Sequence, residues 1–449
     1  MPRKFKSTTR LVYIPQILKS IVENYSKNDK RKTIRLFKGI QNIHKQQNVP
    51  QNHYVDIPRS YLRKIVRDYP KYIQILIDND LIERTGDYSF VNKSQCYSYR
   101  ILPDILDEFK IDSITELPSE KEKFLDESKR QQIKKTLDKL SVNKDAAYQW
   151  IDSYVSKLNI DDFTTNYDIN FEYINLKLPG ETQKVSRDRA ILDAFEEGKV
   201  VVQTKKEDCI VVFPDEFVEQ KKLELEQEYK MQVDMLKRGI YSISRSPLNY
   251  RVYHNLCNLK KELLEFVKLD GQQLVNVDIA NSQIAILVNV IEGNLNYESG
   301  WQFPDVELTD NDQTFLTLAK EGNLYEYIRD MLGLNTRKEA KKTTFSMLFA
   351  HYGRLSIELY QFKQKFPGVF QYIDQFKRLN NRLNGENHRS TLPIFLQRVE
   401  SCLIIDELWD QIPQGVPFLS IHDSFLTTEK NSQMFQNLIH NKLDCKVAA

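Results

Sequence analysis

The stretch LVNVDIANSQI, residues 274–284, sets the expected fold of the C-terminal half. Its first five residues predict a short apolar strand that ends in Asp278, followed by a turn into a helix. A second stretch, FLSIHDSFLTT at 418–428, predicts a hairpin with Asp423 near its tip. Two acids at the exposed ends of two buried strands can lie side by side and share two divalent ions, as phosphoryl transfer requires. Oxygen ligands of this kind favour Mg²⁺.

Between the two acids, a helix is expected to begin near Thr336. Arg337, Lys341, Phe345 and Phe349 follow at steps of four residues, which places them on one helix face. Two cations followed by two aromatic rings could bind a triphosphate and stack a base. The alternative is an ordinary amphipathic helix with its phenylalanines in the core.

The order of these motifs resembles the palm and fingers of the family A DNA polymerases, over about 200 residues from Asn249 to the C-terminus. In that family motif A reads DYSQIE, motif B reads RxxxKxxxFxxxYG and motif C reads HDE. The corresponding segments here are DIANSQIA at 278–285, RKEAKKTTFSMLF at 337–349 with Tyr352-Gly353 close behind, and HDS at 422–424. The family segment YPGV after motif B is similar to FPGV at 366–369.

The resemblance implies an α+β fold: a right-hand polymerase palm with an antiparallel sheet, helical fingers and a thumb. It also implies that Asp278, Asp423 and the Ile279 carbonyl hold two Mg²⁺ ions. A second set of side chains would contact the incoming nucleotide: Arg337, Lys341, Phe345, Phe349, Gln283 and Tyr352. A third set would contact the primer and template: Arg251, His422 and Gln397. The implied catalytic residues are Asp278, Asp423, Lys341 and Arg337.

Motif A departs from the family pattern. Gln283 lies five residues after Asp278 instead of three, and the family glutamate that crowds a sugar 2′-hydroxyl is absent. The spacing from Asp278 to Ser282 and the segment HDSF at 422–425 are closer to the phage-type single-subunit RNA polymerases. A DNA polymerase is therefore the first expectation, with an RNA polymerase or primase as the alternative. A terminal transferase and a non-catalytic replication initiator with a decayed palm also stay open.

The N-terminal region is strongly basic. Residues 1–50 hold twelve lysines and arginines against two acids, although the formal net charge of the whole chain is only +2. We interpret them as a basic arm for a polyanionic partner such as DNA; the alternative is a solvated tail. Helices followed by a hairpin in residues 51–105 predict a winged-helix-like DNA-binding module, or else a small interaction module without DNA contacts. Residues 106–240 are expected to form a linker and a thumb-like helical region, and residues 241–449 the palm and fingers.

Composition narrows the remaining classes. The five cysteines lie far apart and form no zinc-type cluster, which favours a reducing cytoplasm. No apolar stretch approaches the roughly 20 residues that a membrane span needs, so no membrane partner is expected. The expected partners are a DNA template, a primer and nucleoside triphosphates.

Overall fold

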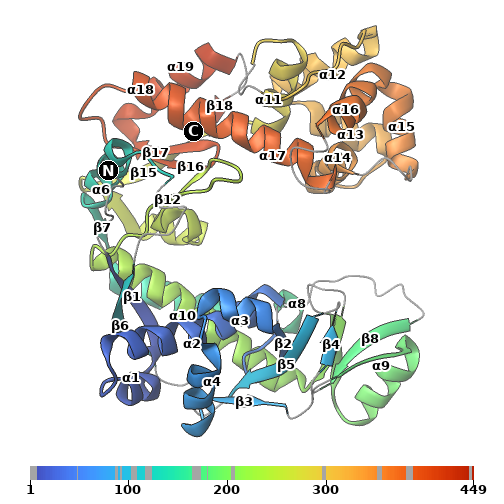
Figure 1. Cartoon of the computed structure of the whole chain (residues 1–449). Helices are drawn as coiled ribbons and strands as arrows, with labels where there is room; N and C mark the ends of the chain where they lie inside the picture. Colours follow the sequence, from blue (N-terminus) through green and yellow to red (C-terminus); the bar gives the residue numbers. More distant parts are fainter. Residues whose placement is uncertain are drawn as a thin grey trace. The chain divides into compact units, whose positions relative to one another are not determined.

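The computed structural model divides into two compact units (Figure 1). Unit 1 consists of Met1–Pro118 and Lys144–Asp234, and unit 2 of Ser119–Asn143 and Met235–Ala449. Both units combine helices with largely antiparallel sheets, so the chain is an α+β protein. None of the described helices is both long and apolar enough to cross a lipid bilayer. The structure describes residues 8–47, 49–85, 89–91, 94–102, 109–116, 124–163, 173–178, 181–203, 208–295, 300–350, 356–380, 388–443 and 447–448.

Unit 1 contains a module in which three helices pack on a small antiparallel sheet. In chain order its elements are α2 (Lys27–Gln47), β2 (Val55–Pro58), α3 (Arg59–Ile65), α4 (Tyr69–Asp78), β3 (Ile82–Arg84), β4 (Ser89–Val91) and β5 (Ser94–Ile101). The strand order is β2-β5-β3, and β4 pairs with the beginning of β5. The module thus has the two short helices and the hairpin that the winged-helix interpretation requires.

Helix α2, residues 27–47, does not belong to a separate basic arm, and this corrects the expected division. Helix α2 lies in the core of the module, because Ile34, Leu36, Phe37 and Ile40 are fully buried. Apolar residues at this spacing form one helix face, which packs in the same core as α3 and α4. The expected boundary at residue 51 therefore cuts through a hydrophobic core, and the module begins at α2.

The expected thumb-like region, residues 106–240, is also divided between the units. Its part in unit 1 includes β6 (Phe109–Glu116), which pairs with β1 (Thr8–Pro15) ahead of α1 (Gln16–Val22). A second sheet there has the order β10-β11-β8-β9, with β8 and β11 parallel. The other elements of this stretch are α7 (Lys144–Ser156), α8 (Ile160–Phe163), β8 (Tyr173–Leu178), β9 (Glu181–Ser186), α9 (Arg187–Glu196), β10 (Val200–Gln203), β11 (Asp208–Val212) and α10 (Pro214–Lys237). Helix α6 (Glu127–Leu137) and β7 (Leu140–Val142) belong to unit 2, because β7 extends its sheet.

The sheet of unit 2 carries both predicted acidic strand ends. Its order is β16-β17-β15-β14-β7, all antiparallel, and β18 (Val447–Ala448) pairs with the end of β15. The strands are β14 (Val267–Leu269), β15 (Gln272–Ile279), β16 (Leu419–Ile421) and β17 (Ser424–Thr428). Helices α11 (Ser282–Ile291) and α19 (Glu429–Leu443) pack against each other and follow β15 and β17 directly. Nearby shorter elements are β12 (Ser244–Arg245), β13 (Val252–Tyr253) and the 3₁₀ helices Asn255–Asn258 and Lys261–Phe266.

A group of helices between β15 and β16 completes unit 2. They are α12 (Asp310–Glu321), α13 (Leu324–Leu332), α14 (Arg337–Phe349), α15 (Ile357–Lys365), α16 (Pro367–Leu379), α17 (His388–Ser401), a π-helical turn at Cys402–Leu408 and α18 (Trp409–Gln411). The buried carboxylate of Asp312 accepts hydrogen bonds from the backbone N–H groups of Gly368 and Val369, both at 3.0 Å. A Cβ at Gly368 would lie 2.6 Å from that carboxylate, so the FPGV segment needs its glycine. Lys377 of α16 donates to the carbonyls of Leu348 and Ala350 and thereby caps the C-terminus of α14.

Candidate active site

Two aspartates that are distant in sequence meet on neighbouring strands of the unit 2 sheet. Asp278 lies near the end of β15 opposite Ser424, the first residue of β17, and Asp423 directly precedes Ser424. The backbone N–H of Ile279 donates to the carbonyl of Asp423 at 3.3 Å. The structure therefore places both carboxylates at the same end of the sheet, on half-buried residues.

The two carboxylates interact electrostatically. Burial and, to a smaller extent, the negative charge of Asp423 raise the pKa of Asp278 to about 6, although the positive charge of Lys341 lowers it. Ionising both acids is therefore unfavourable without a compensating cation. Lys341 supplies part of this compensation from α14, where its side chain is exposed.

A third carboxylate, Glu400, lies in the same network, and the sequence reasoning missed it. Its side chain is fully buried on α17, and Arg251 donates to its Oε1 from Nε at 2.9 Å and from Nη2 at 2.6 Å. Burial raises the pKa of Glu400 to about 7, although Arg251 and a hydrogen bond from Gln283 lower it. An acid inside the apolar run LPIFLQRVESCLII, residues 392–405, is the signal that could have identified it.

Ser282 links this third carboxylate to the pair. Its hydroxyl lies 2.6 Å from Oδ2 of Asp423 and 3.4 Å from Oε2 of Glu400. A hydroxyl has a single proton, so the shorter contact is the donated hydrogen bond. Ser282 therefore fixes the orientation of the Asp423 carboxylate.

The residues expected to contact a primer gather around the same carboxylates. His422 and Asp423 form a two-residue turn between β16 and β17, in which His422 has a φ of +54°. The His422 ring packs edge-on against the Tyr253 ring, with 5.7 Å between the ring centroids. Burial and the positive charge of Arg251 lower the pKa of His422, and the negative charge of Asp423 opposes this effect. Asn249 donates to Oε1 of Gln397 at 3.1 Å, which ties α17 to the segment that carries Arg251.

Helix α14 presents the expected stripe on its accessible face. The rings of Phe345 and Phe349 are half-buried and stack at 5.4 Å with an interplanar angle of 29°. The residues that face the core are instead Ala340, Thr344, Met347 and Leu348. Phe345 also lies 6.3 Å from the ring of the fully buried Tyr325, so its ring is partly in the core, and base stacking stays a prediction.

The two cations of this stripe share an aromatic neighbour. The guanidinium carbon of Arg337 lies 5.2 Å from the ring centroid of Tyr325, and Nζ of Lys341 lies 6.0 Å from it. Arg337 also forms an ion pair of 2.6 Å with Glu326. This ion pair uses only Nε of the guanidinium, so a phosphate bound through Nε would have to displace Glu326. Tyr352 lies outside the described residues.

Ile279 ends β15 and pairs with Val447 of β18, next to Asp278. The part of the chain that the structure describes holds no group of three or more histidine, cysteine, aspartate or glutamate side chains that could bind a metal ion.

Comparison of the chain with models of known protein families gives no match, and neither does comparison with curated proteins. The site is therefore interpreted from its own chemistry.

Proposed function

We propose that the protein is a template-directed nucleotidyltransferase that extends the 3′ end of a primer, with unit 2 as a right-hand polymerase palm and fingers. The observation that carries this proposal is that the side chains of Asp278 and Asp423 lie close together at one end of an antiparallel sheet. Lys341 supports it, because it is close enough to affect the ionisation of Asp278. DNA is the first candidate for template and product, and nucleoside triphosphates are the proposed substrates.

The donor set fits Mg²⁺. Carboxylate and carbonyl oxygens are the ligands that this ion prefers, and a divalent cation would relieve the repulsion that raises the pKa of Asp278. Asp278 and Asp423, with the carbonyl of Ile279, would hold two such ions. When bound, the ions supply activation of the primer hydroxyl and neutralisation of the leaving pyrophosphate.

The side chains of this chain orient the substrates. Lys341 binds the β- and γ-phosphates as a point charge, and Arg337 binds them bidentately after exchanging Glu326 for phosphate. Phe345 and Phe349 provide a stacking surface for the incoming base, beside Gln283 and the proposed contact Tyr352.

A separate set of side chains holds the primer end. Arg251, His422 and Gln397 are the proposed contacts. Glu400 positions Arg251 through its ion pair, and Ser282 positions Asp423 through its hydrogen bond. Glu400 and Ser282 are therefore positioning residues.

RNA synthesis or priming is the second candidate, and a specific observation favours it. Motif A has no glutamate that could exclude a sugar 2′-hydroxyl, and the serine four residues after Asp278 instead bonds Asp423. Under this candidate the same residues keep the same roles with ribonucleoside triphosphates.

Primer extension by the purified chain tests the proposal. Labelled deoxynucleotides and ribonucleotides are supplied separately with Mg²⁺, with and without primer and template. Asp278→Asn and Asp423→Asn should each lower the rate about a thousandfold or more, because several kcal/mol of transition-state stabilisation are lost.

Asp270→Asn is the matched control. Asp270 is an exposed acid in the turn between β14 and β15, and asparagine tolerates its positive φ. This variant should retain full activity. Activity in both the Asp278 and Asp423 variants would end the two-carboxylate model. Extension without a template would indicate a terminal transferase, and no incorporation by the wild type would favour the non-catalytic initiator.

A further inference from the structure

Unit 1 contains a basic pocket that plays no part in the proposed chemistry. Helix α2 and the turn between α3 and α4 line a space of about 560 Å³ that is widely open to solvent. Its charged lining consists of four cations, Arg31, Lys32, Arg35 and Arg67, and one acid, Asp68. The lining thus has three more positive than negative side chains, and it collects cations that are up to 36 residues apart in the sequence.

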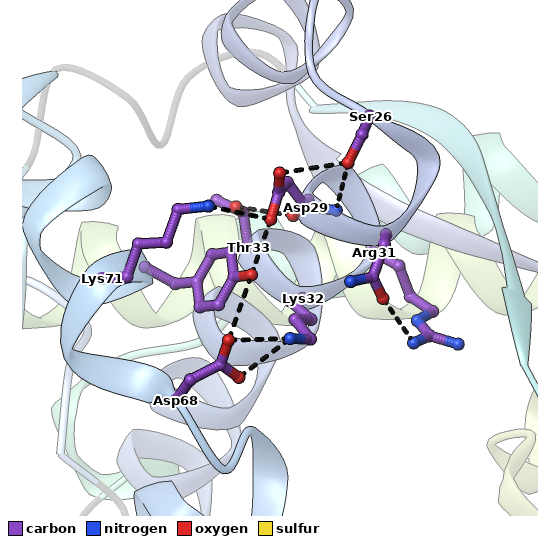
Figure 2. A network of polar contacts seen from close by, with 9 residues as sticks. Ser26, Asp29, Arg31, Lys32, Thr33, Asp68 and Lys71 are labelled. Carbon is purple, nitrogen blue, oxygen red and sulfur yellow. Dashed lines mark hydrogen bonds and ion pairs between the residues drawn. The ribbon is translucent and has the colours of Figure 1, made fainter.

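The charge of the one acid is already compensated. Nζ of Lys32 lies 2.9 and 2.8 Å from the two carboxylate oxygens of Asp68 (Figure 2). The hydrogen bond from Lys32 lowers the pKa of Asp68, so the pair is ionised at neutral pH. The neighbouring acid Asp29 is held in the same way by Tyr72 and Lys71. The excess positive charge of the pocket is therefore not cancelled by these acids.

Two features of the pocket favour an anionic ligand. Nη2 of Arg31 donates to Asn28 at 2.8 Å, whereas its Nε is buried and has no hydrogen-bond partner among the described residues. A buried donor without an acceptor is unfavourable, and an anionic oxygen would satisfy it. The carboxylate of Asp68, at the N-cap of α4, makes no capping hydrogen bond because it faces Lys32. The positive end of the ten-residue helix α4 therefore adds to the potential of the pocket.

The exposed face of α4 is a poorer match for a polyanion. Lys71 is paired with Asp29, and Gln74 donates to Asp78 at 2.6 Å. The positive charge of this module lies instead on α2, on the exposed cations of α3 (Arg59, Arg63 and Lys64) and on the turn before α4. A nucleic acid would therefore be attracted to the turn rather than to the centre of α4.

We propose that this pocket binds backbone phosphates of DNA. Unit 1 then binds the nucleic acid at a site distinct from that of Asp278 and Asp423. Guanidinium groups bind phosphate oxygens bidentately, and three arginines from two elements can engage neighbouring phosphates. Binding through phosphates carries little sequence information and depends strongly on salt.

Fluorescence anisotropy with the full chain and a blunt duplex of about twenty base pairs tests this site. In the triple variant Arg31→Ala, Arg35→Ala, Arg67→Ala, affinity near 0.1 M salt should fall about tenfold for each phosphate that is no longer bound. The slope of log K against log salt should become shallower by about 0.9 for each such phosphate.

A control of equal charge loss lies elsewhere in unit 1. Arg187→Ala, Arg189→Ala, Lys199→Ala removes three cations on or beside α9, each of which has an acidic neighbour. This variant should bind DNA like the wild type. If both triple variants weaken binding equally, only net charge matters and the pocket is not a site.

A variant with the opposite expected effect separates loss of the site from loss of folding. Asp68→Asn removes the acid of the pocket, so it should tighten DNA binding several-fold and steepen the salt slope. Weaker or unchanged binding would overturn the proposal. Binding of anionic phospholipid vesicles or free inorganic phosphate, lost in the arginine variant while DNA binding persists, would also overturn it.

The phosphate pocket and the two-aspartate site can fail separately. The Asp278→Asn protein should bind the blunt duplex with wild-type affinity even though it cannot extend a primer. Loss of extension therefore says nothing about the pocket, and loss of duplex binding in the arginine variant says nothing about the aspartates.

Discussion

Replacing Glu400 by glutamine should make unit 2 more stable at pH 8 while lowering nucleotide addition. The charged form of Glu400 is fully buried, and burial raises its pKa from the ordinary 4.5 to about 7 in spite of its ion pair with Arg251. Glutamine has nearly the shape of the protonated acid and never ionises. The variant therefore avoids the cost of burying the charge.

The magnitude follows from the pKa difference. Raising the pKa of Glu400 from 4.5 to about 7 corresponds to roughly 3 kcal/mol between the two protonation states. Because the folded pKa is raised, the protonated form stabilises the fold fully below pH 4.5, and this stabilisation is lost as the pH rises to about 7. Between pH 5 and pH 8 the wild type should lose about 2–3 kcal/mol of unfolding free energy through Glu400. Asp278, with its pKa of about 6, should add a smaller loss of the same sign.

A competing effect must be weighed against this gain. Removing one partner of a buried ion pair often costs about 3–5 kcal/mol, because the other charge is left without compensation. Arg251, however, keeps 17% of its side chain exposed, so water can reach the guanidinium, and the glutamine carbonyl can still accept its hydrogen bond. We therefore expect the desolvation of the carboxylate to decide the sign.

Urea unfolding monitored by tryptophan fluorescence measures the effect. Trp150 lies in unit 1, whereas Trp301 and Trp409 lie in unit 2, so a Trp150→Phe background reports unit 2 alone. The Glu400→Gln variant should match the wild type near pH 5 and exceed its unfolding free energy by about 2–3 kcal/mol at pH 8. Glu265→Gln, at an exposed position, should change neither value. Parallel pH profiles for Glu400→Gln and the wild type, or a loss of stability at pH 8, would refute the reasoning.

Two further predictions concern helices α16 and α14. Gly368→Ala should destabilise unit 2 by about 2–4 kcal/mol in the same assay, because the added Cβ would displace the buried carboxylate of Asp312 from two backbone donors. Lys341→Met should raise the KM for the nucleotide and shift the acidic limb of the pH–rate profile to higher pH, because Lys341 lowers the pKa of Asp278. Lys342→Met on the same helix is the control and should do neither. Identical profiles for the two variants would contradict the assignment of Lys341 to the nucleotide site.

The sequence predicted the local elements of unit 2 well. The strand expected over 274–278 lies within β15, and the hairpin expected over 418–428 is formed by β16 and β17. Alternating and continuous apolar patterns determine such elements locally. The stripe on α14 was predicted for the same reason, since a step of four residues fixes a helix face.

Tertiary features were harder to predict. Helix α2 was interpreted as part of a basic arm because its cations dominate the composition, although its apolar residues bury one face. The division of residues 106–240 between two units depends on long-range pairing, such as β7 with β14, which no local pattern encodes. Glu400 was missed as a site residue because it belongs to none of the motifs that the resemblance supplied. Its proposed positioning role follows from its contacts with Arg251 and Ser282.

The positions of residues with a left-handed backbone support the location of the proposed site at the end of the unit 2 sheet that carries Asp278 and Asp423. Among the described residues, five non-glycine residues have a positive φ, and Tyr250, Asn281 and His422 are three of them. Each adjoins a residue of the site in sequence: Arg251, Ser282 and Asp423, respectively. Asparagine adopts the left-handed conformation readily, but at a bulky residue such as Tyr250 it costs about 1–3 kcal/mol and persists only where the surrounding contacts require it. The π-helical turn directly after α17 is a further irregularity, of a kind that often occurs at functional sites. The strained backbone at Tyr250 and the buried carboxylate of Glu400 therefore lie beside the residues to which we assign the proposed function.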